Sequence, residues 1–196
     1  MMKRTHFFAY LSRMKYIRRW GLMRNTRTEN IQEHSLEVAI IAHALAIIRN
    51  RLYGGNLNPE RVMVLAAFHE ISEVITGDLA TPIKYFNPEI KNAYSGIEQV
   101  ARERLFNMLP PELQPDFADV ILEKSPDDAD HWKVVKAADK LCAYLKCLEE
   151  LKAGNREFEK AEMSIRKQLE AMDQPEVAYF MEVFLPSYRL TLDELN

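Results

Sequence analysis

The sequence contains little glycine and little cysteine, and both shortages narrow the range of possible folds. Its 196 residues include 6 glycines and 2 cysteines. Cys142 and Cys147 lie on one predicted helix, so a disulfide framework is not indicated. The 9 prolines fall between periodic segments and not within alternating, strand-like patterns, which is typical of long helices joined by short loops. We therefore predict an all-α fold.

The sequence also lacks a strong charge of either sign and a hydrophobic run that could cross a bilayer. The formal net charge is −3 and the pI is about 6.0, so the overall field attracts neither a nucleic acid polymer nor an anionic membrane. The longest apolar stretch, residues 38–48, contains His43 and is shorter than the roughly 18 to 20 residues of a spanning helix. No secretory signal pattern is recognisable. We expect a soluble, cytoplasmic protein that binds neither nucleic acid polymers nor membranes.

The length and the hydrophobic content indicate one domain. A chain of 196 residues with 47% hydrophobic content is long enough for one well-buried core and short for two full domains. Apolar periodicity, together with breaks at glycine and proline, predicts several helices and a loop over residues 77–82. The predicted helices cover about 6–17, 30–53, 59–76, 88–108, a short stretch after Pro111, 127–152, 156–172 and 175–184. We expect a single domain over residues 1–196.

Two imidazoles and two carboxylates on three of these predicted helices are the strongest functional signal. They belong to His34, the adjacent pair His69 and Glu70, and Asp139 within an apolar run. Imidazole and carboxylate together suit zinc, manganese, iron, cobalt or nickel. Consecutive helix residues point about 100° apart, so a metal held by both His69 and Glu70 would lie at the flank of their helix. We predict a divalent metal site, with room for a water that would attack near neutral pH.

Each of these residues also has a purely structural interpretation. His34 could bond to nearby backbone at the start of its helix, and the pair at 69–70 could mark a helix passing from the core into solvent. Asp139 could form a salt bridge with Lys136 or Lys140. The metal interpretation is stronger for Asp139, because a charge on an apolar helix is costly unless it is paired or metal-bound.

The segment from His69 to Glu73 begins like the zinc-protease motif H-E-x-x-H. That motif requires a second histidine four residues after the first, and here that position is Glu73. A zinc protease is therefore excluded. We expect Glu73 to lie one turn beyond His69 on the same helix face, where a carboxylate could orient or deprotonate a metal-bound water.

Several longer and unusual segments carry a resemblance to one known family. They are residues 6–13, 18–20, 22–25, 27–30, 33–36, 76–79, 81–82, 84–87, 137–139 and 141–150. Across them the chain resembles the HD-domain phosphohydrolases, and more narrowly the bacterial 5′-deoxynucleotidases, which remove phosphate from 2′-deoxynucleoside 5′-monophosphates. The resemblance implies a single-domain HD helical bundle, one divalent transition metal such as cobalt or manganese, and a homodimer.

The resemblance also implies roles for individual residues. The metal ligands are His34, His69, Glu70 and Asp139, and Glu73 is the acidic residue of catalysis. Arg19 and Trp20 hold and orient the phosphate, and the loop after Gly77 contacts the sugar, with Asp78 as partner of the 3′-hydroxyl. A pocket too close-fitting for a 2′-hydroxyl would reject ribonucleotides. The residues implied in substrate binding are Arg19, Trp20, His34, Glu70, Asp78, Leu79, Ala80, Thr81 and Asp139.

Without the resemblance, the substrate-binding residues would be interpreted differently. Arg19 and Trp20 would be a surface arginine beside an anchor at a helix end, and Asp78 would be a turn residue. The aromatic side chains near the C-terminus, Tyr179, Phe180, Phe184 and Tyr188, give weak support to a dimer surface, and ordinary core packing explains them equally well.

The chain departs from the family at Glu70, where the family has aspartate. Glutamate keeps the charge and moves the carboxylate outward by roughly 1.5 Å, about one carbon–carbon bond. Two alternative functions stay open, the first of them because of Glu70. One is a catalytically impaired, nucleotide-binding HD protein. The other is an HD phosphohydrolase of different nucleotide specificity, which would share the metal ligands but not the matches at Arg19, Trp20 and residues 78–81.

Overall fold

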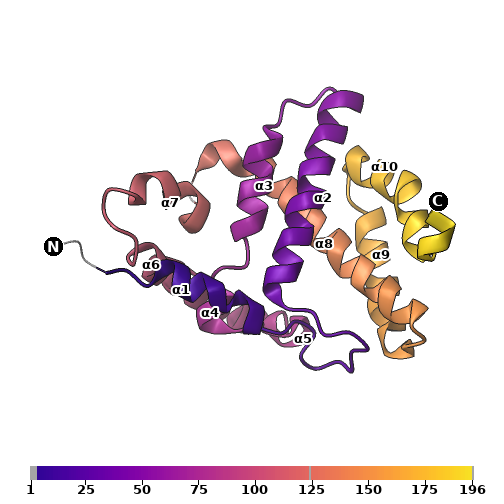
Figure 1. Ribbon diagram of the computed structural model, residues 1–196, viewed down its shortest axis with the longest axis horizontal. Helices are drawn as coiled ribbons and strands as arrows, with labels where there is room; N and C mark the ends of the chain where they lie inside the picture. The colour runs from indigo at the N-terminus through magenta and orange to yellow at the C-terminus, as the bar shows by residue number, and fades with distance from the viewer. Residues whose placement is uncertain (1–3, 124, 196) are drawn as a thin grey trace. The chain divides into compact units, whose positions relative to one another are not determined.

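The computed structural model describes residues 4–123 and 125–195, and within them the regular secondary structure is entirely helical (Figure 1). An isolated antiparallel bridge joins Arg18 and Asn30. The all-α prediction is confirmed. The α-helices are α1 (Phe7–Leu11), α2 (Ile31–Leu52), α3 (Pro59–Phe68), α4 (Glu73–Thr76), α5 (Thr81–Lys84), α6 (Pro88–Phe106), α7 (Gln114–Leu122), α8 (Ala129–Lys152), α9 (Glu159–Glu170) and α10 (Pro175–Val183). The 3-10 helices are η1 (Ser12–Tyr16), η2 (Pro126–Asp128), η3 (Arg156–Phe158), η4 (Leu185–Arg189) and η5 (Leu192–Leu195).

The chain divides into two compact units. The first comprises Met1–Met23, Thr28–Ser35 and Ala67–Asp128, and the second comprises Arg24–Arg27, Leu36–Ala66 and Ala129–Asn196. That the chain forms one domain stays a prediction.

In the first unit, α6 packs against α1, α4, α5 and α7. The apolar core of this unit fixes the chain beside the candidate site, because Ile31 and Ile71 are almost fully buried and lie next to α2's first turn and to Glu70. Burying one such side chain stabilises the folded protein by about 1.5–3 kcal/mol. The core residues are Phe7, Met14, Ile31, Ile71, Leu105, Leu109 and Ile121.

The predicted helix over residues 59–76 is wrong, because it is broken at its centre. Helix α3 ends at Phe68, residues 69–72 form a turn, and α4 begins at Glu73. The backbone N–H groups of Ile71 and Glu73 donate to the carbonyls three residues back, at 3.2 and 3.0 Å. This tighter winding replaces the i to i−4 bonds of an α-helix. His69 and Glu70 therefore lie on a turn, and Glu73 is not one helical turn beyond His69.

Helix α2 meets the length and mean hydropathy of a membrane-spanning helix, but 56% of its most apolar window is buried inside the structure. This burial is typical of the core helix of a soluble protein. The helix also carries the fully buried His34.

In the second unit, α8 packs against α9, η3 and η4. It carries both cysteines, which are free and buried.

Of the aromatic residues considered as a dimer surface, Phe180 is buried and Phe184 is exposed. Their rings lie 5.3 Å apart. For Phe180 the structure favours the second of the two interpretations, ordinary core packing, because its side chain is buried in the unit.

A buried acidic residue, Glu150, ties α8 to the loop segment 24–27. Its Oε2 accepts hydrogen bonds from the backbone N–H of Thr26 at 2.8 Å, from the Thr26 hydroxyl at 2.7 Å and from Asn155 at 2.8 Å. Lys146 donates to Oε1, and both side chains of this ion pair are at most 5% exposed. Burial works against the charged form, but the hydrogen bonds outweigh it and hold the pKa of Glu150 well below its usual range.

We expect Glu150→Ala to lower the free energy of unfolding by about 3 kcal/mol, because it leaves a buried ammonium without its carboxylate. Since the folded-state pKa is depressed, the contribution is fully present at neutral pH. It is lost progressively as the pH falls from about 4.3, the usual pKa of glutamate, toward the lower folded-state pKa. Urea unfolding of wild type and variant at pH 7 and at about pH 2.5 measures both effects. The exposed neighbour Glu149 supplies the control, Glu149→Ala, and an equal loss in both variants would contradict the prediction.

Candidate active site

The first turn of α2 places His34 in the core of the first unit. Asn30 caps this helix, because its side-chain oxygen accepts from the backbone N–H groups of Gln32 and Glu33, each at 3.0 Å. The His34 N–H donates to the carbonyl of Asn30 at 3.1 Å. Its side chain is fully buried. The predicted position of His34 near the start of a long helix is therefore confirmed.

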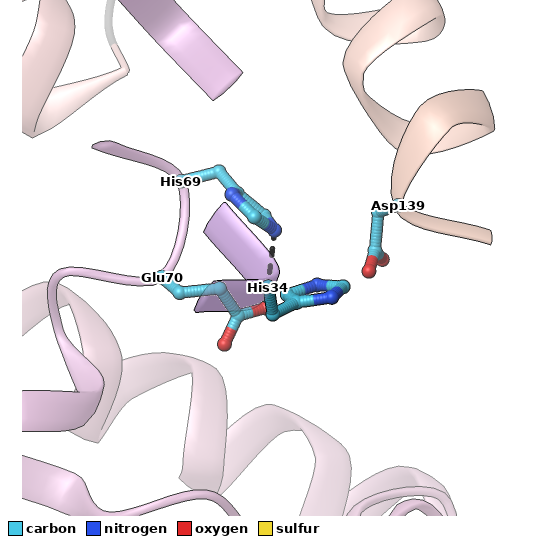
Figure 2. Close-up of side chains that lie close together, drawn as sticks. All are labelled: His34, His69, Glu70 and Asp139. Carbon is cyan, nitrogen blue, oxygen red and sulfur yellow. Dashed lines mark ion pairs between the residues drawn. The ribbon is translucent and has the colours of Figure 1, made fainter. Parts of the chain in front are cut away.

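The turn after α3 brings His69 and Glu70 to His34 (Figure 2). The two imidazole rings have centroids 5.4 Å apart and planes tilted by 50°. The Nε2 atom of His69 lies 3.5 Å from Oε1 of Glu70. Each of these residues offers one ligand atom, and those atoms lie within 4.8 Å of one another. Two imidazole nitrogens and a carboxylate oxygen at such spacing can converge on one divalent transition metal.

The tight turn is also supported from outside. Arg102 of α6 donates from Nη2 to the backbone carbonyl of His69 at 3.5 Å, and its Nη1 forms an ion pair with Glu123. The carbonyl at the end of α3 thus has a charged donor. Arg102 was not predictable as a supporting residue, because nothing in its local sequence distinguishes it from the other arginine on α6, Arg104.

Glu73 is a buried carboxylate in the first unit. It is 6% exposed, and its backbone N–H donates to the carbonyl of Glu70 at 3.0 Å. Burial raises the pKa of Glu73, and the neighbouring carboxylates of Glu70 and Asp78 raise it further, while Arg19 opposes them. Its Oε2 has no hydrogen-bond partner within the described part of the chain.

This gathering of carboxylates fits a cation. Glu70, Glu73 and Asp78 interact electrostatically within a partly buried region. The Glu70 carboxylate raises the cost of ionising both Glu73 and Asp78, and Asp78 raises that of Glu73 further. A bound divalent cation would reverse that cost. The donor set and the local surplus of negative charge therefore both suit a metal.

Arg19 and Trp20 lie opposite Glu29, because the Arg18–Asn30 bridge pairs their two backbone segments. The N–H of Arg19 donates to the carbonyl of Glu29 at 3.0 Å. The Trp20 indole donates to Oε2 of Glu29 at 3.1 Å, and Nη1 of Arg19 is 3.6 Å from the same oxygen. The Arg19 side chain is 14% exposed. Arg19 is therefore not the surface arginine that its sequence alone would suggest.

The loop after Gly77 is bound to the same region. Gly77 has φ 72°, which favours glycine, and its carbonyl accepts from the Tyr94 hydroxyl at 3.2 Å. Burial raises the pKa of Asp78, whereas Arg19 and a hydrogen bond from the Trp20 backbone lower it. That hydrogen bond ties the loop to the Arg19-Trp20 segment. Leu79 and Ala80 are half-buried, and Thr81 is exposed at the start of α5.

Asp139 belongs to the second unit, where α8 carries it, and its side chain is half-buried between the buried Ala138 and Leu141. Lys140, one of the two lysines considered as its salt-bridge partner, donates to Gln168 at 2.6 Å. His131 of α8 accepts a hydrogen bond from the backbone N–H of Asn58, just before α3, at 3.2 Å.

Comparisons with known proteins match the chain over most of its length. A family model described as "5′-deoxynucleotidase YfbR-like" matches residues 6–188. Two relatives named 5′-deoxynucleotidase YfbR come from Escherichia coli O1:K1 / APEC and from Escherichia coli strain ATCC 8739. Each is 56% identical over 195 residues, which cover 100% of this chain and 98% of the relative.

Solved structures show the same fold at lower identity. An HD-domain phosphohydrolase from Listeria innocua matches with a TM-score of 0.80 and 23% identity, covering 93% of this chain and 88% of that one. A cyanophage S-2L HD phosphohydrolase, DatZ, bound to dA and one catalytic Zn²⁺ ion, matches with a TM-score of 0.62 and 20% identity, covering 95% and 99%.

We expect Mn²⁺, Co²⁺ or Zn²⁺ to raise the melting temperature of chelator-treated protein, because a ligand that binds only the folded state stabilises it by about 2.7 kcal/mol at 100 times its Kd. His34→Ala and His69→Ala should each abolish most of the rise. Differential scanning calorimetry measures it, and His6→Ala, at an exposed histidine, is the control. An equal rise in all four proteins would contradict a site at His34 and His69.

Proposed function

Because the chain belongs to the YfbR-like 5′-deoxynucleotidase family, we propose specific roles for its residues in the reaction of that family. The protein is a hydrolase that converts 2′-deoxynucleoside 5′-monophosphates to deoxynucleoside and phosphate. The family predicted from the sequence is confirmed, with the HD-domain fold. The comparisons do not favour an impaired nucleotide-binding protein or a different nucleotide specificity.

His34, His69, Glu70 and Asp139 are the proposed ligands of one divalent metal. The convergence of His34, His69 and Glu70 supports three of them. The position of Asp139 on an otherwise apolar helix supports the fourth, because a half-buried carboxylate there gains from coordination. Cobalt and manganese remain candidates beside zinc. When bound, such a metal supplies Lewis-acid polarisation of the phosphate and an acidic water.

Arg19 and Trp20 are the proposed phosphate-binding pair. The Arg19 guanidinium offers several N–H donors for phosphate oxygens and stabilises the charge that develops on them. The indole wall of Trp20 limits how the phosphate can turn.

Glu73 is the proposed catalytic residue. Its pKa is raised, and its Oε2 has no hydrogen-bond partner among the described residues. Both properties suit a carboxyl that holds and transfers a proton there.

The loop from Asp78 to Thr81 is the proposed sugar-binding segment. The Asp78 carboxylate can accept a hydrogen bond from a 3′-hydroxyl. The bond from the Trp20 backbone to Asp78 supports contact with the sugar and the phosphate of one nucleotide at the same time. Selectivity against ribonucleotides would follow from a pocket that leaves a 2′-hydroxyl without space or without a partner.

We also propose a cytoplasmic homodimer, with an exposed apolar stripe on α2 as the contact surface. Leu36, Ile40 and Ile47 are spaced four and seven residues apart, so they lie on one face of α2. Their side chains are 60%, 57% and 40% exposed. Contiguous exposed apolar side chains mark association surfaces. The proposed partner is a second copy of this chain, as the family resemblance implied.

We expect phosphate release from 2′-deoxynucleoside 5′-monophosphates in the presence of Co²⁺ or Mn²⁺, and release from the matching ribonucleotides slower by at least about tenfold, the effect of 1.4 kcal/mol in the barrier. A colorimetric phosphate assay over both substrate series, with and without chelator, measures this. Equal rates for deoxy and ribo substrates would contradict the sugar-binding proposal.

Glu70 should still ligate metal although the family has aspartate at this position. We expect Glu70→Gln to weaken Mn²⁺ binding by at least about tenfold, and Glu70→Asp to retain it, because only the glutamine variant loses an anionic ligand. Isothermal titration calorimetry measures the dissociation constants. The exposed Glu60 supplies the control Glu60→Gln. Unchanged binding by Glu70→Gln, or an empty site in wild-type protein supplied with metal, would sink this role.

Ile40→Glu should convert the dimer to a monomer, because it places a charge at the centre of the proposed apolar contact. Light scattering coupled to size-exclusion chromatography measures the mass. Met163→Glu is the matched control, since Met163 is a 69% exposed apolar residue on α9. A wild-type protein that is already monomeric would refute the dimer, and so would an Ile40→Glu variant that remains dimeric.

A further inference from the structure

Glu29 is a partly buried acidic residue on which three functional side chains converge. Its side chain is 12% exposed. Oε2 accepts from the Trp20 indole at 3.1 Å and lies 3.6 Å from Nη1 of Arg19. Oε1 lies 3.7 Å from Nδ1 of His34. We propose that Glu29 is a positioning residue that holds the phosphate-binding pair and a metal-binding imidazole in one arrangement, an inference that rests on the roles proposed above for Arg19, Trp20 and His34.

The backbone sets these groups opposite one another. The Arg18–Asn30 bridge, the Arg19 N–H to Glu29 carbonyl bond and the Ile31 N–H to Ile17 carbonyl bond, each 3.0 Å, fix the register between the two segments. The same Asn30 caps α2. A displacement of Glu29 would therefore act on the Arg19-Trp20 segment and on the first turn of α2 together.

The side chain of Glu29 acts differently on each partner. For Arg19 and Trp20 it is a charged acceptor, which restricts the guanidinium and the indole before substrate arrives. For His34 it is a negative charge beside Nδ1. By its charge, a carboxylate 3.7 Å from that nitrogen favours the tautomer with the proton on Nδ1, which leaves the lone pair of Nε2 for a metal.

Trp20 gives independent support for this role. Its φ is 58°, in the left-handed region that residues with a side chain seldom adopt. Strained backbone of this kind persists where surrounding contacts hold it, and it is concentrated at ligand-binding sites. Glu29 supplies two such contacts. Its carbonyl accepts from the backbone N–H of Arg19, just before Trp20, and its carboxylate accepts from the Trp20 indole.

A purely structural role for Glu29 would lower stability and affect all ligands equally. A positioning role predicts selective effects. Metal and phosphate should bind more weakly, the indole should gain mobility, and a ligand without phosphate should be affected little.

The test uses the full chain with Trp132→Phe, so that Trp20 is the remaining tryptophan of the two. Glu29→Ala and Glu29→Gln are compared with Glu33→Ala and Glu33→Gln, at an exposed glutamate in the first turn of α2. The measurements are Mn²⁺ dissociation constants by calorimetry, KM and kcat for 2′-deoxyadenosine 5′-monophosphate, inhibition by 2′-deoxyadenosine, and acrylamide quenching of Trp20 fluorescence. Melting temperatures identify any variant that fails to fold.

We expect Glu29→Ala to raise the Mn²⁺ dissociation constant and the KM by about tenfold each and to increase Trp20 quenching. Inhibition by deoxyadenosine should be unchanged. Glu29→Gln keeps an acceptor for the indole and loses the charge, so it should restore the quenching of wild type but not its metal affinity. Both Glu33 variants should behave as wild type.

Wild-type metal affinity, KM and quenching in both Glu29 variants would overturn the proposal. So would equal loss of monophosphate and deoxyadenosine binding, which would indicate a structural role. If the wild-type protein fails to hydrolyse deoxynucleotides, the proposed function fails separately. The Mn²⁺ and quenching measurements then still decide the role of Glu29, because they need no turnover.

Discussion

Mutual repulsion among the carboxylates of Glu70, Glu73 and Asp78 is the constraint on which the arrangement of the candidate site depends. These groups lie in a partly buried region, where burial and like charge raise the pKa of both Glu73 and Asp78. Such a grouping is costly in a folded protein unless positive charge compensates it. Arg19 supplies part of that compensation, and a divalent metal held by the neighbouring imidazoles would supply more. Substrate phosphate would then enter a site whose charge is already balanced for it.

The rest of the first unit holds this unfavourable grouping in place. Ile31 and Ile71 are buried in its core, one residue from the cap of α2 and one residue from Glu70. The turn between α3 and α4 is tightened by i to i−3 bonds and supported by Arg102 at the carbonyl of His69. The free energy gained by burying these apolar side chains thus compensates for the electrostatic cost of the site. Proteins commonly tolerate functional sites that lower their stability in this way.

In the second unit, the buried carboxylate of Glu150 has hydrogen-bond donors for both of its oxygens. Glu150 is bonded by Lys146, Thr26 and Asn155, so its pKa is depressed, in contrast to the raised pKa of Glu73. Both carboxylates are buried. Their opposite shifts follow from their partners: hydrogen-bond donors surround Glu150, whereas other carboxylates surround Glu73. The contrast separates a structural carboxylate from one suited to proton transfer.

Helices α2 and α8 were predictable almost to the residue, because long apolar periodicity ends at Gly54 and at Gly154. The residue types at positions 34, 69, 70 and 139 alone indicated a divalent metal, and the longer matching segments indicated the family. The break after Phe68 was not predictable, since residues 59–76 contain no glycine or proline after Pro59. Only tertiary packing decided it, by burying Ile71 and Glu73 together. Tertiary structure likewise decided the role of Glu29, because its contacts with Arg19, Trp20 and His34 depend on how two segments pair in space, and a linear sequence does not specify which side chains will share one carboxylate.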